Sequence, residues 1–225
     1  MVTRLAHLSA RLIRLIPPHI AMPTLSVSVD GQLLAAVSSE DGYDMLSVHV
    51  SCSRLDEDFA TLDLSGGFYP EEGDSTYLTW IDMMPIQAAQ TITVSLLDEG
   101  VTTHPGKTIQ ELSDDDSEAF DYEQMPPVSE MVAELKKRPL LRGEYTFEFL
   151  APDSTQLNGQ TLQEEESLAM SVIWHALHRD GKARVSLHSY TLEGLAVRAP
   201  SNDHARYKLG IGESIQLQLG TLAAP

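Results

Sequence analysis

Four histidines in the second half of the chain could bind a metal: His175, His178, His188 and His204. Neutral imidazoles that lie close together bind zinc, which takes four nitrogen or sulfur ligands. His175 and His178, however, are three residues apart at the end of a predicted strand, where such residues point to opposite faces of a sheet. No cysteine pair accompanies them. The sequence therefore favours exposed or hydrogen-bonded histidines and predicts no metal and no cofactor.

Nucleophilic chemistry has weaker support. The chain has no Gly-x-Ser-x-Gly turn and no glycine-rich phosphate loop. Asp203 and His204 could form a triad with Ser189 or Ser201 only if the fold brings them together. The single cysteine, Cys52, has apolar neighbours and is typical of a packing residue. The sequence predicts no catalytic residue, and a small enzyme that uses the histidine-bearing second half is the alternative hypothesis.

Two runs of carboxylates could bind a hard cation: Asp56-Glu57-Asp58 and Asp114-Asp115-Asp116. Calcium loops place their ligands at alternate positions around a glycine turn. Neither run has this spacing, so both are better interpreted as solvated acidic loops.

The acidic residues are distributed unevenly. The chain has 33 acidic and 15 basic residues, a formal charge of −18. Residues 25–100 contain 14 acids and one base, Arg54, which gives −13, whereas residues 144–225 contain 10 acids and 6 bases, which gives −4. Such a surface repels nucleic-acid phosphates and anionic membranes and attracts basic proteins. We therefore expect neither nucleic acid nor membrane as a partner.

The exposed acids of residues 25–100 are the candidate binding residues for a basic protein. The best candidates lie in two predicted loops, Asp56, Glu57 and Asp58 in one, and Glu71, Glu72 and Asp74 in the next. Complementary charge raises association rates and selects partners. The sequence thus favours a non-enzymatic protein-binding module, with an inhibitor or immunity-type partner of a basic protein as the specific hypothesis. Acidity that only maintains solubility, and an assembly module with pairing edge strands, are the other interpretations.

The elements that must position these residues occur twice along the chain. Residues 46–50 match 170–174, 60–64 match 183–187, and 89–96 match 212–219. The offsets are 124 (170 − 46), 123 (183 − 60) and 123 (212 − 89) residues, and the blocks keep their order. This internal repeat indicates a duplicated structural unit.

The first unit, residues 24–100, has the pattern of about six β-strands. Leu25, Val27 and Val29 alternate with serines, and Asp30-Gly31 then predicts a tight hairpin. Further strands are predicted at 33–37, 45–51, 60–64, 77–81 and 91–97. The Ser65-Gly66-Gly67 sequence is interpreted as a turn or bulge that ends a strand.

The motifs of the first unit follow one order along the sequence. They are the hairpin at 29–33, the strand at 45–50, Leu-x-Leu-x-Gly-Gly at 62–67, x-Leu-x-Trp at 77–80 and the closing strand at 90–96. This order, over roughly residues 25–97, resembles a small uncharacterised bacterial β domain with no assigned activity. The resemblance implies a β fold and a bacterial origin, and it carries over no catalytic residue. The second unit lacks the Gly-Gly pair and the tryptophan at the corresponding places.

The second unit covers residues 143–220, with Tyr145, Phe147 and Phe149 in place of Leu25, Val27 and Val29. The segment 101–142 joins the units. Within it, seven acids in the thirteen residues 111–123 favour a solvated chain. Residues 128–138 predict a helix between two prolines, and we expect it to pack on one of the sheets.

The sequence therefore predicts an all-β, mainly antiparallel protein with two repeated small sandwich or partly open barrel units, joined by an acidic linker and one short helix. Residues 1–23 and 221–225 are expected to be tails outside the fold. The single cysteine and the lack of a long apolar run favour a cytoplasmic protein. Alternation predicts that the following residues are buried: Val48, Val50, Leu62, Leu64, Trp80, Ile92, Val94, Val172, Trp174, Val185, Leu187, Ile215 and Leu217.

Overall fold

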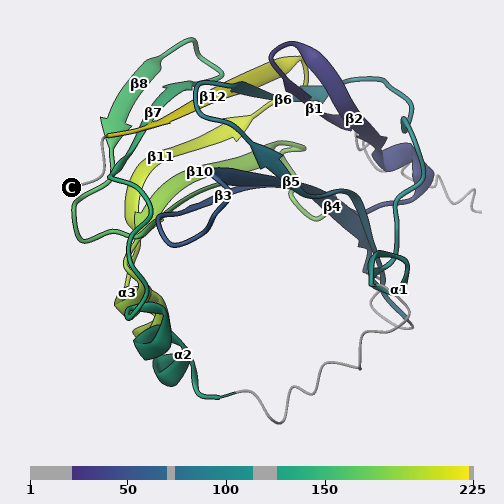
Figure 1. The fold of residues 1–225 in the computed structure, drawn as a ribbon. Helices are drawn as coiled ribbons and strands as arrows, with labels where there is room; N and C mark the ends of the chain where they lie inside the picture. Colours follow the sequence, from purple (N-terminus) through teal and green to yellow (C-terminus); the bar gives the residue numbers. More distant parts are fainter. Residues whose placement is uncertain (1–21, 70–73, 114–125, 223–225) are drawn as a thin grey trace, which may run out of the picture.

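The computed structural model describes residues 22–69, 74–113 and 126–222. In these ranges, twelve β-strands form two six-stranded antiparallel sheets that pack face to face (Figure 1). The all-β antiparallel fold predicted from the sequence is confirmed. Residues 1–21 and 223–225 of the two predicted tails, the acidic run Asp114-Asp115-Asp116 and the rest of 114–125 lie outside the described residues. Thr221, predicted to begin the C-terminal tail, instead ends the last strand and pairs with Tyr145.

We name the two sheets A and B. The strand order of sheet A is β2 (Gln32–Ser38), β1 (Thr24–Val29), β6 (Thr91–Leu97), β12 (Glu213–Thr221), β7 (Tyr145–Leu150) and β8 (Gln156–Gln160). The strand order of sheet B is β11 (Asn202–Leu209), β10 (Ala183–Tyr190), β9 (Ser167–His175), β3 (Met45–Ser53), β4 (Ala60–Phe68) and β5 (Thr76–Ile86). Each half of the chain thus contributes three neighbouring strands to each sheet, and the two repeats build one sandwich together.

The two repeats are related by a pseudo-twofold axis between their strands. In sheet B, Val48 of β3 lies opposite Val172 of β9, 124 residues further along the chain (172 − 48). In sheet A, Thr93 of β6 lies opposite Gln216 of β12, 123 residues further along (216 − 93). These differences equal the offsets of the corresponding sequence blocks. The repeat found in the sequence is therefore also the symmetry of the strand pairing.

The outer strands correct the predicted alignment by two residues. Val27 pairs with Val94, and Phe149 pairs with the equivalent Leu217, so Val27 corresponds to Phe149 and not to Phe147. In the same way Leu64 of β4 corresponds to Val185 of β10, because they face Val48 and Val172. A shift of two residues keeps every side chain on its face of the sheet. Hydrophobic alternation alone cannot distinguish the two registers.

The Gly66-Gly67 pair does not end β4, contrary to the prediction. The strand continues to Phe68, and both glycines pair with β3 and β5, next to a register shift between Leu64 and Ser65. A Cβ atom on Gly67 would lie 1.8 Å from the carbonyl oxygen of Thr76, and one on Gly66 would lie 2.4 Å from that of Met45. Glycine is required here by the close approach of the neighbouring backbones.

The hydrophobic core lies between the sheets. All thirteen residues predicted to be buried are buried, which confirms the inward faces of the seven strands that carry them. Trp80 of β5 is 7% exposed and meets the ring of Tyr43 edge to face, with 5.0 Å between the ring centroids.

The segment after β6 covers one side of the sandwich. The amide of Thr103 donates to the carbonyl oxygen of Ala36 in β2 at 3.0 Å, and Lys107 exchanges two backbone hydrogen bonds of 2.8 Å with Thr79 in β5. The short helix α1 (Ile109–Leu112) follows directly. This covering segment, residues 101–108, therefore protects the edges of both sheets on the side of the first repeat.

Three further short elements complete the described residues: the 3-10 helix η1 (Ser39–Asp41), α2 (Val128–Leu135) and α3 (Leu192–Val197). The predicted helix at 128–138 is confirmed as α2, although it ends at Leu135. We expected it to pack on a sheet. Instead Val132, the only buried residue of the helix, packs against Leu192 of α3 and Leu55 of the β3–β4 loop.

Candidate functional site

The acidic loop between β3 and β4 carries Asp56, Glu57 and Asp58 and is held through its backbone. The guanidinium of Arg142, in the loop between α2 and β7, donates to the carbonyl oxygens of Ser53 at 2.8 Å, Asp58 at 2.7 Å and Glu57 at 2.9 Å. These bonds use no carboxylate. The three acidic side chains therefore stay exposed on a loop whose backbone is anchored.

Two buried groups support this anchor. Arg54 is 1% exposed, and its guanidinium donates to the carbonyl oxygens of Arg142 at 3.1 Å and Gln163 at 2.7 Å. The Tyr145 hydroxyl accepts from Arg142 at 3.1 Å and lies 2.9 Å from the carbonyl oxygens of Ser53 and Phe59. Burial raises the pKa of Tyr145 to about 12. Sequence reasoning missed this network because its acceptors are backbone carbonyls, which every residue carries.

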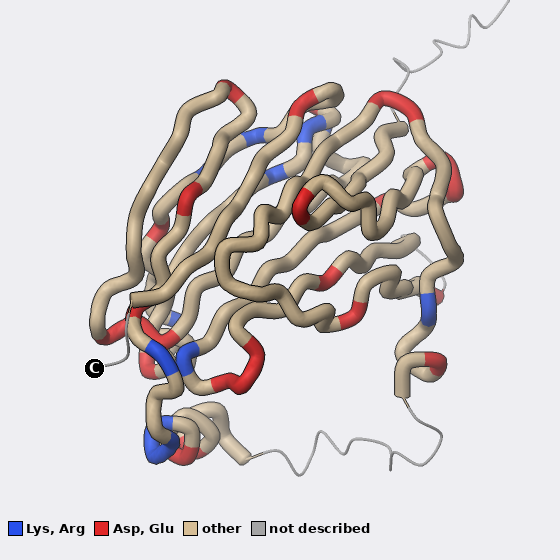
Figure 2. The backbone as a smooth tube through the Cα atoms, turned by 45° about the horizontal axis from the view of Figure 1, so that its top comes forward, with Lys and Arg blue, Asp and Glu red and all other residues tan. Residues whose placement is uncertain are grey.

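The carboxylates of the first repeat have no basic partner in the described chain. The five ion pairs involve Glu134, Asp180, Glu193 and Asp203, and none involves an acid between residues 24 and 100. The one base of that range, Arg54, is buried on carbonyl oxygens. Figure 2 shows that Lys and Arg gather on few segments, such as the end of α2, while Asp and Glu are widespread. The negative charge of the first repeat is therefore uncompensated over its described residues.

The two predicted binding loops lie far apart. Asp56, Glu57 and Asp58 precede β4, whereas Asp74 follows it. The strand has nine residues, which at about 3.3 Å per residue separates its ends by about 26 Å. Glu71 and Glu72 lie outside the described residues. The described candidates thus form one loop at one end of β4 and a single exposed aspartate at the other.

The outer face of sheet B, which points away from the core, carries a polar row across five strands. From β4 to β11, directly opposite residues are Asp63, His49, Ser171, Ser186 and Arg206. The hydroxyl oxygens of Ser171 and Ser186 are 2.8 Å apart. The row is therefore acidic on the side of the first repeat and basic on the side of the second.

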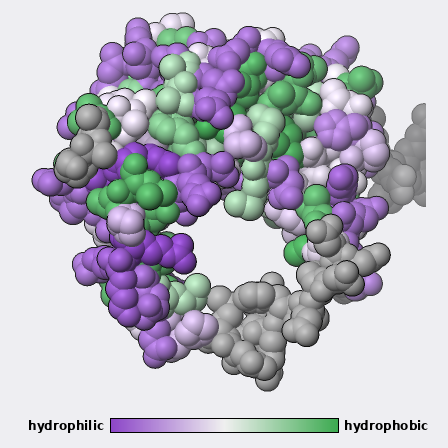
Figure 3. Space-filling model, viewed as in Figure 1, coloured by the Kyte–Doolittle hydropathy of each residue, from purple (hydrophilic) through white to green (hydrophobic). Residues whose placement is uncertain are grey.

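A groove of about 420 Å³ lies over the acidic end of this row, and we call it the β5–α1 groove. Its lining residues are His49, Asp63, Ser65, Tyr77, Thr79, Asp82, Ile109, Leu112 and Ser113. Figure 3 shows this side of sheet B above an open hollow, flanked by α1 on one side and by α2 and α3 on the other. Burial lowers the pKa of His49, which favours a neutral imidazole near pH 7.

The four predicted histidines do not meet at one place. His175 ends β9 and His178 lies in the following turn, so their rings are side by side with 5.8 Å between centroids, contrary to the prediction of opposite faces. The described residues hold no group of three or more His, Cys, Asp or Glu that could bind a metal ion. His188 lies on β10 opposite Asp203 of β11.

His204 does meet Ser189, but without the third member of a triad. A bulge in β11 leaves His204 out of the pairing with β10, and its Nε2 atom lies 2.7 Å from the Ser189 hydroxyl oxygen. Ser189 is fully buried, and the Asp203 carboxylate instead pairs with Arg206 at 2.6 Å. Cys52 is buried too, and burial raises the pKa of its thiol. Ser189 and Cys52 are therefore shielded from solvent, whereas His204 is half-buried.

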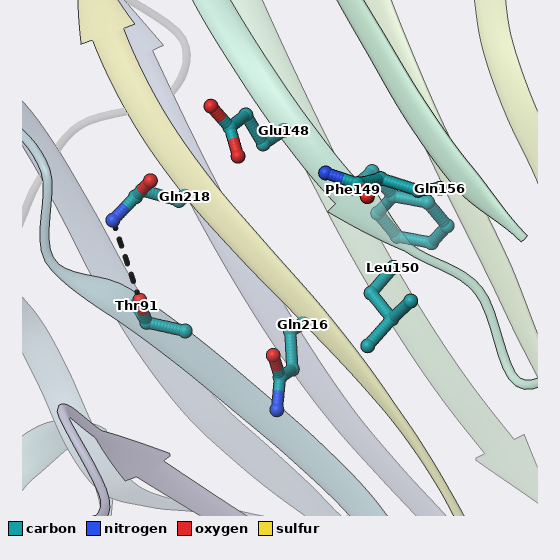
Figure 4. A pocket seen from close by; sticks show the side chains of 7 residues that line it. All are labelled: Thr91, Glu148, Phe149, Leu150, Gln156, Gln216 and Gln218. Carbon is teal, nitrogen blue, oxygen red and sulfur yellow. Dashed lines mark hydrogen bonds between the residues drawn. The ribbon is translucent and has the colours of Figure 1, made fainter. Parts of the chain in front are cut away.

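The outer face of sheet A offers a smaller and less charged site. A pocket of about 200 Å³ lies between β6, β12, β7 and β8, and its side chains include Gln216, Gln218 and a single acid, Glu148 (Figure 4). The Gln218 amide nitrogen is 3.5 Å from the Thr91 hydroxyl oxygen. Two other pockets have about 320 Å³ and about 530 Å³; the first lies on the same face of sheet A, and the second lies on sheet B and is lined by Arg184, Arg206 and Lys208. The β5–α1 groove is the better candidate for a basic partner because both of its charged lining residues are acidic.

Comparisons with protein-family models, with curated proteins and with solved structures find no match to this chain. The resemblance of residues 25–97 to a bacterial β domain therefore stays a prediction. In the part of the chain that the structure describes, no helix has both the length and the apolar character needed to cross a bilayer. The candidate site is accordingly the acidic surface of the first repeat, defined by the anchored β3–β4 loop and the β5–α1 groove.

Proposed function

We propose that the protein is a non-enzymatic binding module for a basic protein, of the inhibitor or immunity type, in a bacterial cytoplasm. The observation that carries the proposal is the absence of ion pairs for the described carboxylates of residues 24–100. Folding does not require one repeat to hold so many unpaired acids when its symmetry mate pairs several of its own. A positively charged partner supplies the missing counter-charge.

The anchored β3–β4 loop suits such a partner for a second reason. Arg142 fixes the loop through three carbonyl oxygens and leaves Asp56, Glu57 and Asp58 exposed. A preorganised loop loses less conformational entropy when a partner binds than a free loop does. Exposed charges act over roughly a Debye length, about 8 Å at physiological salt, so the loop mainly accelerates association.

The hypothesis of an edge-strand assembly module is less favoured. The covering segment already pairs with β2 and β5. On the opposite side of the sandwich, the edge strand β11 carries Asp203, Arg206 and Lys208, and charged side chains on an edge oppose pairing with another chain. The remaining edge strand, β8, carries no charged residue, so these arguments apply to three of the four sheet edges.

The test compares association kinetics with a partner isolated by affinity capture. The variant D56N/E57Q/D58N removes three charges from the loop and leaves the carbonyl oxygens that bind Arg142. The control E148Q/D153N/E164Q removes three exposed charges from the second repeat. At about 20 mM salt we expect the loop variant to associate about tenfold more slowly, and at about 150 mM salt this difference should shrink. The control should stay within about twofold of the wild type.

Equal association rates for the two triple variants would contradict the proposal, because acidity would then act only through net charge. A partner that binds the second repeat alone would contradict it as well. Turnover of a substrate without any stoichiometric partner would instead favour the enzyme hypothesis.

A further inference from the structure

The β5–α1 groove offers hydrogen-bond acceptors and negative charge, and no positive charge. Its charged lining residues are Asp63 and Asp82, and neither forms an ion pair with a described residue. The only other titratable groups of the lining are His49, whose pKa burial lowers, and the phenol of Tyr77. An anion would be repelled by this lining, whereas a cation would find several oxygen atoms facing it.

The polar groups of the groove keep acceptor capacity. One carboxylate oxygen of Asp63 accepts the amide of Met83 at 2.9 Å, which leaves the second oxygen for another donor. Thr79 is 9% exposed and lines the groove, and its hydroxyl has no hydrogen-bond partner among the described residues, although its backbone is fully paired with Lys107. The Thr79 hydroxyl therefore remains available to a ligand in the groove.

One wall of the groove is apolar and fixed in place. Ile109, 62% exposed, and Leu112 line it from α1. A capping box holds the helix, in which the Thr108 amide donates to Glu111 at 2.7 Å and the Glu111 amide donates to the Thr108 hydroxyl at 3.3 Å. The backbone pair between Lys107 and Thr79 joins the start of α1 to β5. The exposed isoleucine and the two aspartates thus line one groove whose two sides are joined by backbone hydrogen bonds.

A groove lined by an apolar wall and two carboxylates matches one kind of side chain. Lysine and arginine carry an aliphatic stem that packs on apolar surface and a charged head that binds carboxylates. We propose that the β5–α1 groove receives a lysine or arginine side chain of the basic partner, with its stem against Ile109 and Leu112 and its head between Asp63 and Asp82. This inference rests on the proposed function and assigns a specificity-determining pocket to it.

The assignment explains why the groove and the anchored loop lie on the same half of sheet B. The loop precedes β4, and the groove lies over β4 and β5. An exposed loop attracts a basic surface without selecting its shape, whereas a groove with an apolar wall selects the length and the stem of one side chain. On this proposal the β3–β4 loop attracts the basic partner, and the β5–α1 groove selects the side chain that binds.

The test titrates the full chain, labelled with ¹⁵N, with three small probes: Nα-acetyl-arginine amide, Nα-acetyl-lysine amide and the uncharged Nα-acetyl-leucine amide. Amide shifts at Asp63, Asp82, Ile109 and Leu112 report on the groove, and those at Asp56, Glu57 and Asp58 report on the loop. We expect both cationic probes to shift the groove amides in a saturable manner and the leucine probe to leave them in place.

Three variants make the test specific. D63N/D82N removes both charges, and the amide oxygen that it introduces at position 63 can still accept the backbone amide of Met83. We expect it to weaken cation binding by about fivefold or more. I109S shortens the apolar wall and should weaken binding by about twofold to threefold. The control D98N/E99Q removes two exposed charges from the same repeat outside the groove and should change binding by less than about twofold.

Saturable shifts at the loop with none at the groove would overturn the groove assignment and leave the proposed function intact. Equal weakening by D63N/D82N and D98N/E99Q would overturn it as well, because net charge would then explain binding. No shift anywhere in the first repeat with either cation would count against both the groove and the proposed function.

Discussion

Three side chains, those of Arg54, Arg142 and Tyr145, connect the β3–β4 loop of the first repeat to the start of the second repeat through hydrogen bonds. Arg142 and Arg54 donate to backbone carbonyls and not to carboxylates. Because carbonyl oxygens satisfy both guanidinium groups, the acidic side chains nearby are left without a basic partner. Tyr145 completes the network with a hydroxyl that must stay protonated to donate. The pH range in which this network is intact therefore follows from the pKa of Tyr145.

Replacing Tyr145 with phenylalanine should change the alkaline stability of the fold. The pKa of Tyr145 is raised to about 12 in the folded chain, against about 10 in an unfolded one. The stability that its protonated hydroxyl contributes is thus full below about pH 10 and is lost as the pH rises toward 12. We expect Tyr145→Phe to cost about 1 kcal/mol at pH 7 through lost hydrogen bonds.

The same variant should lose less stability than the wild type between about pH 10 and pH 12, because it has no phenol to ionise there. Urea unfolding at about pH 7, 9 and 10.5 measures both effects, with Tyr77→Phe on the exposed part of β5 as the control. A parallel decline of wild type and Tyr145→Phe at high pH would show that other groups govern the alkaline loss.

Among the elements, β4 is notable because its backbone lies unusually close to those of the neighbouring strands β3 and β5. The sequence Leu-x-Leu-x-Gly-Gly indicated a strand with an interruption, and the structure instead places both glycines inside the strand. Gly67 allows the backbone of β5 to approach so closely that no side chain fits between them. β5 in turn carries Trp80, Thr79 and the covering segment, so the position of the groove depends on this contact.

Gly67→Ala should separate β4 from β5 at this point. A Cβ atom would lie 1.8 Å from the carbonyl oxygen of Thr76, and backbone cannot move aside as a side chain can. We expect a loss of about 2 kcal/mol or more in unfolding free energy. The control is Gly31→Ala in the hairpin between β1 and β2, where nothing lies within 4 Å but φ is +78°, so only conformational strain is added.

Urea unfolding and amide hydrogen exchange distinguish the two glycine variants. Gly67→Ala should lose protection at Thr76, Tyr77 and Leu78, and Gly31→Ala should lose it only near the hairpin. Unchanged protection along β5 in a folded Gly67→Ala protein would mean that the strands tolerate the extra carbon, and the argument from close approach would be wrong.

The whole molecule is one sandwich built from two repeats. Val48 and Val172 are fully buried at the centre of the β3–β9 pair, and Ile92 lies opposite Leu217 in the other sheet. A single repeat would expose the inner strand edges of both sheets, β3 and β6. Because the pairing is symmetric, a second copy of the same repeat could cover those edges with the same register.

A fragment of residues 22–113 should therefore not fold as a monomer. We expect either an unfolded chain or a dimer in which β3 pairs with β3 and β6 pairs with β6. Sedimentation and circular dichroism of this fragment over a range of concentrations measure the outcome, and the variant Val48→Asp at the centre of the pairing should abolish any dimer. A cooperatively folding monomer would show that each repeat is an independent domain.

Most strands, their inward faces and the repeat can be predicted from the sequence, since these depend on local alternation and on spacing along the chain. Val48, Trp80 and Leu217 could be assigned to the core for this reason. The sharing of both sheets by the two repeats and the anchoring of the acidic loop by Arg142 are visible only in the folded chain. The same is true of the bulge that brings His204 to Ser189 and of the groove that α1 lines together with Asp63 and Asp82. Strand partners are chosen by contacts between residues far apart in the chain, and a backbone carbonyl that accepts an arginine looks the same in sequence as one that does not.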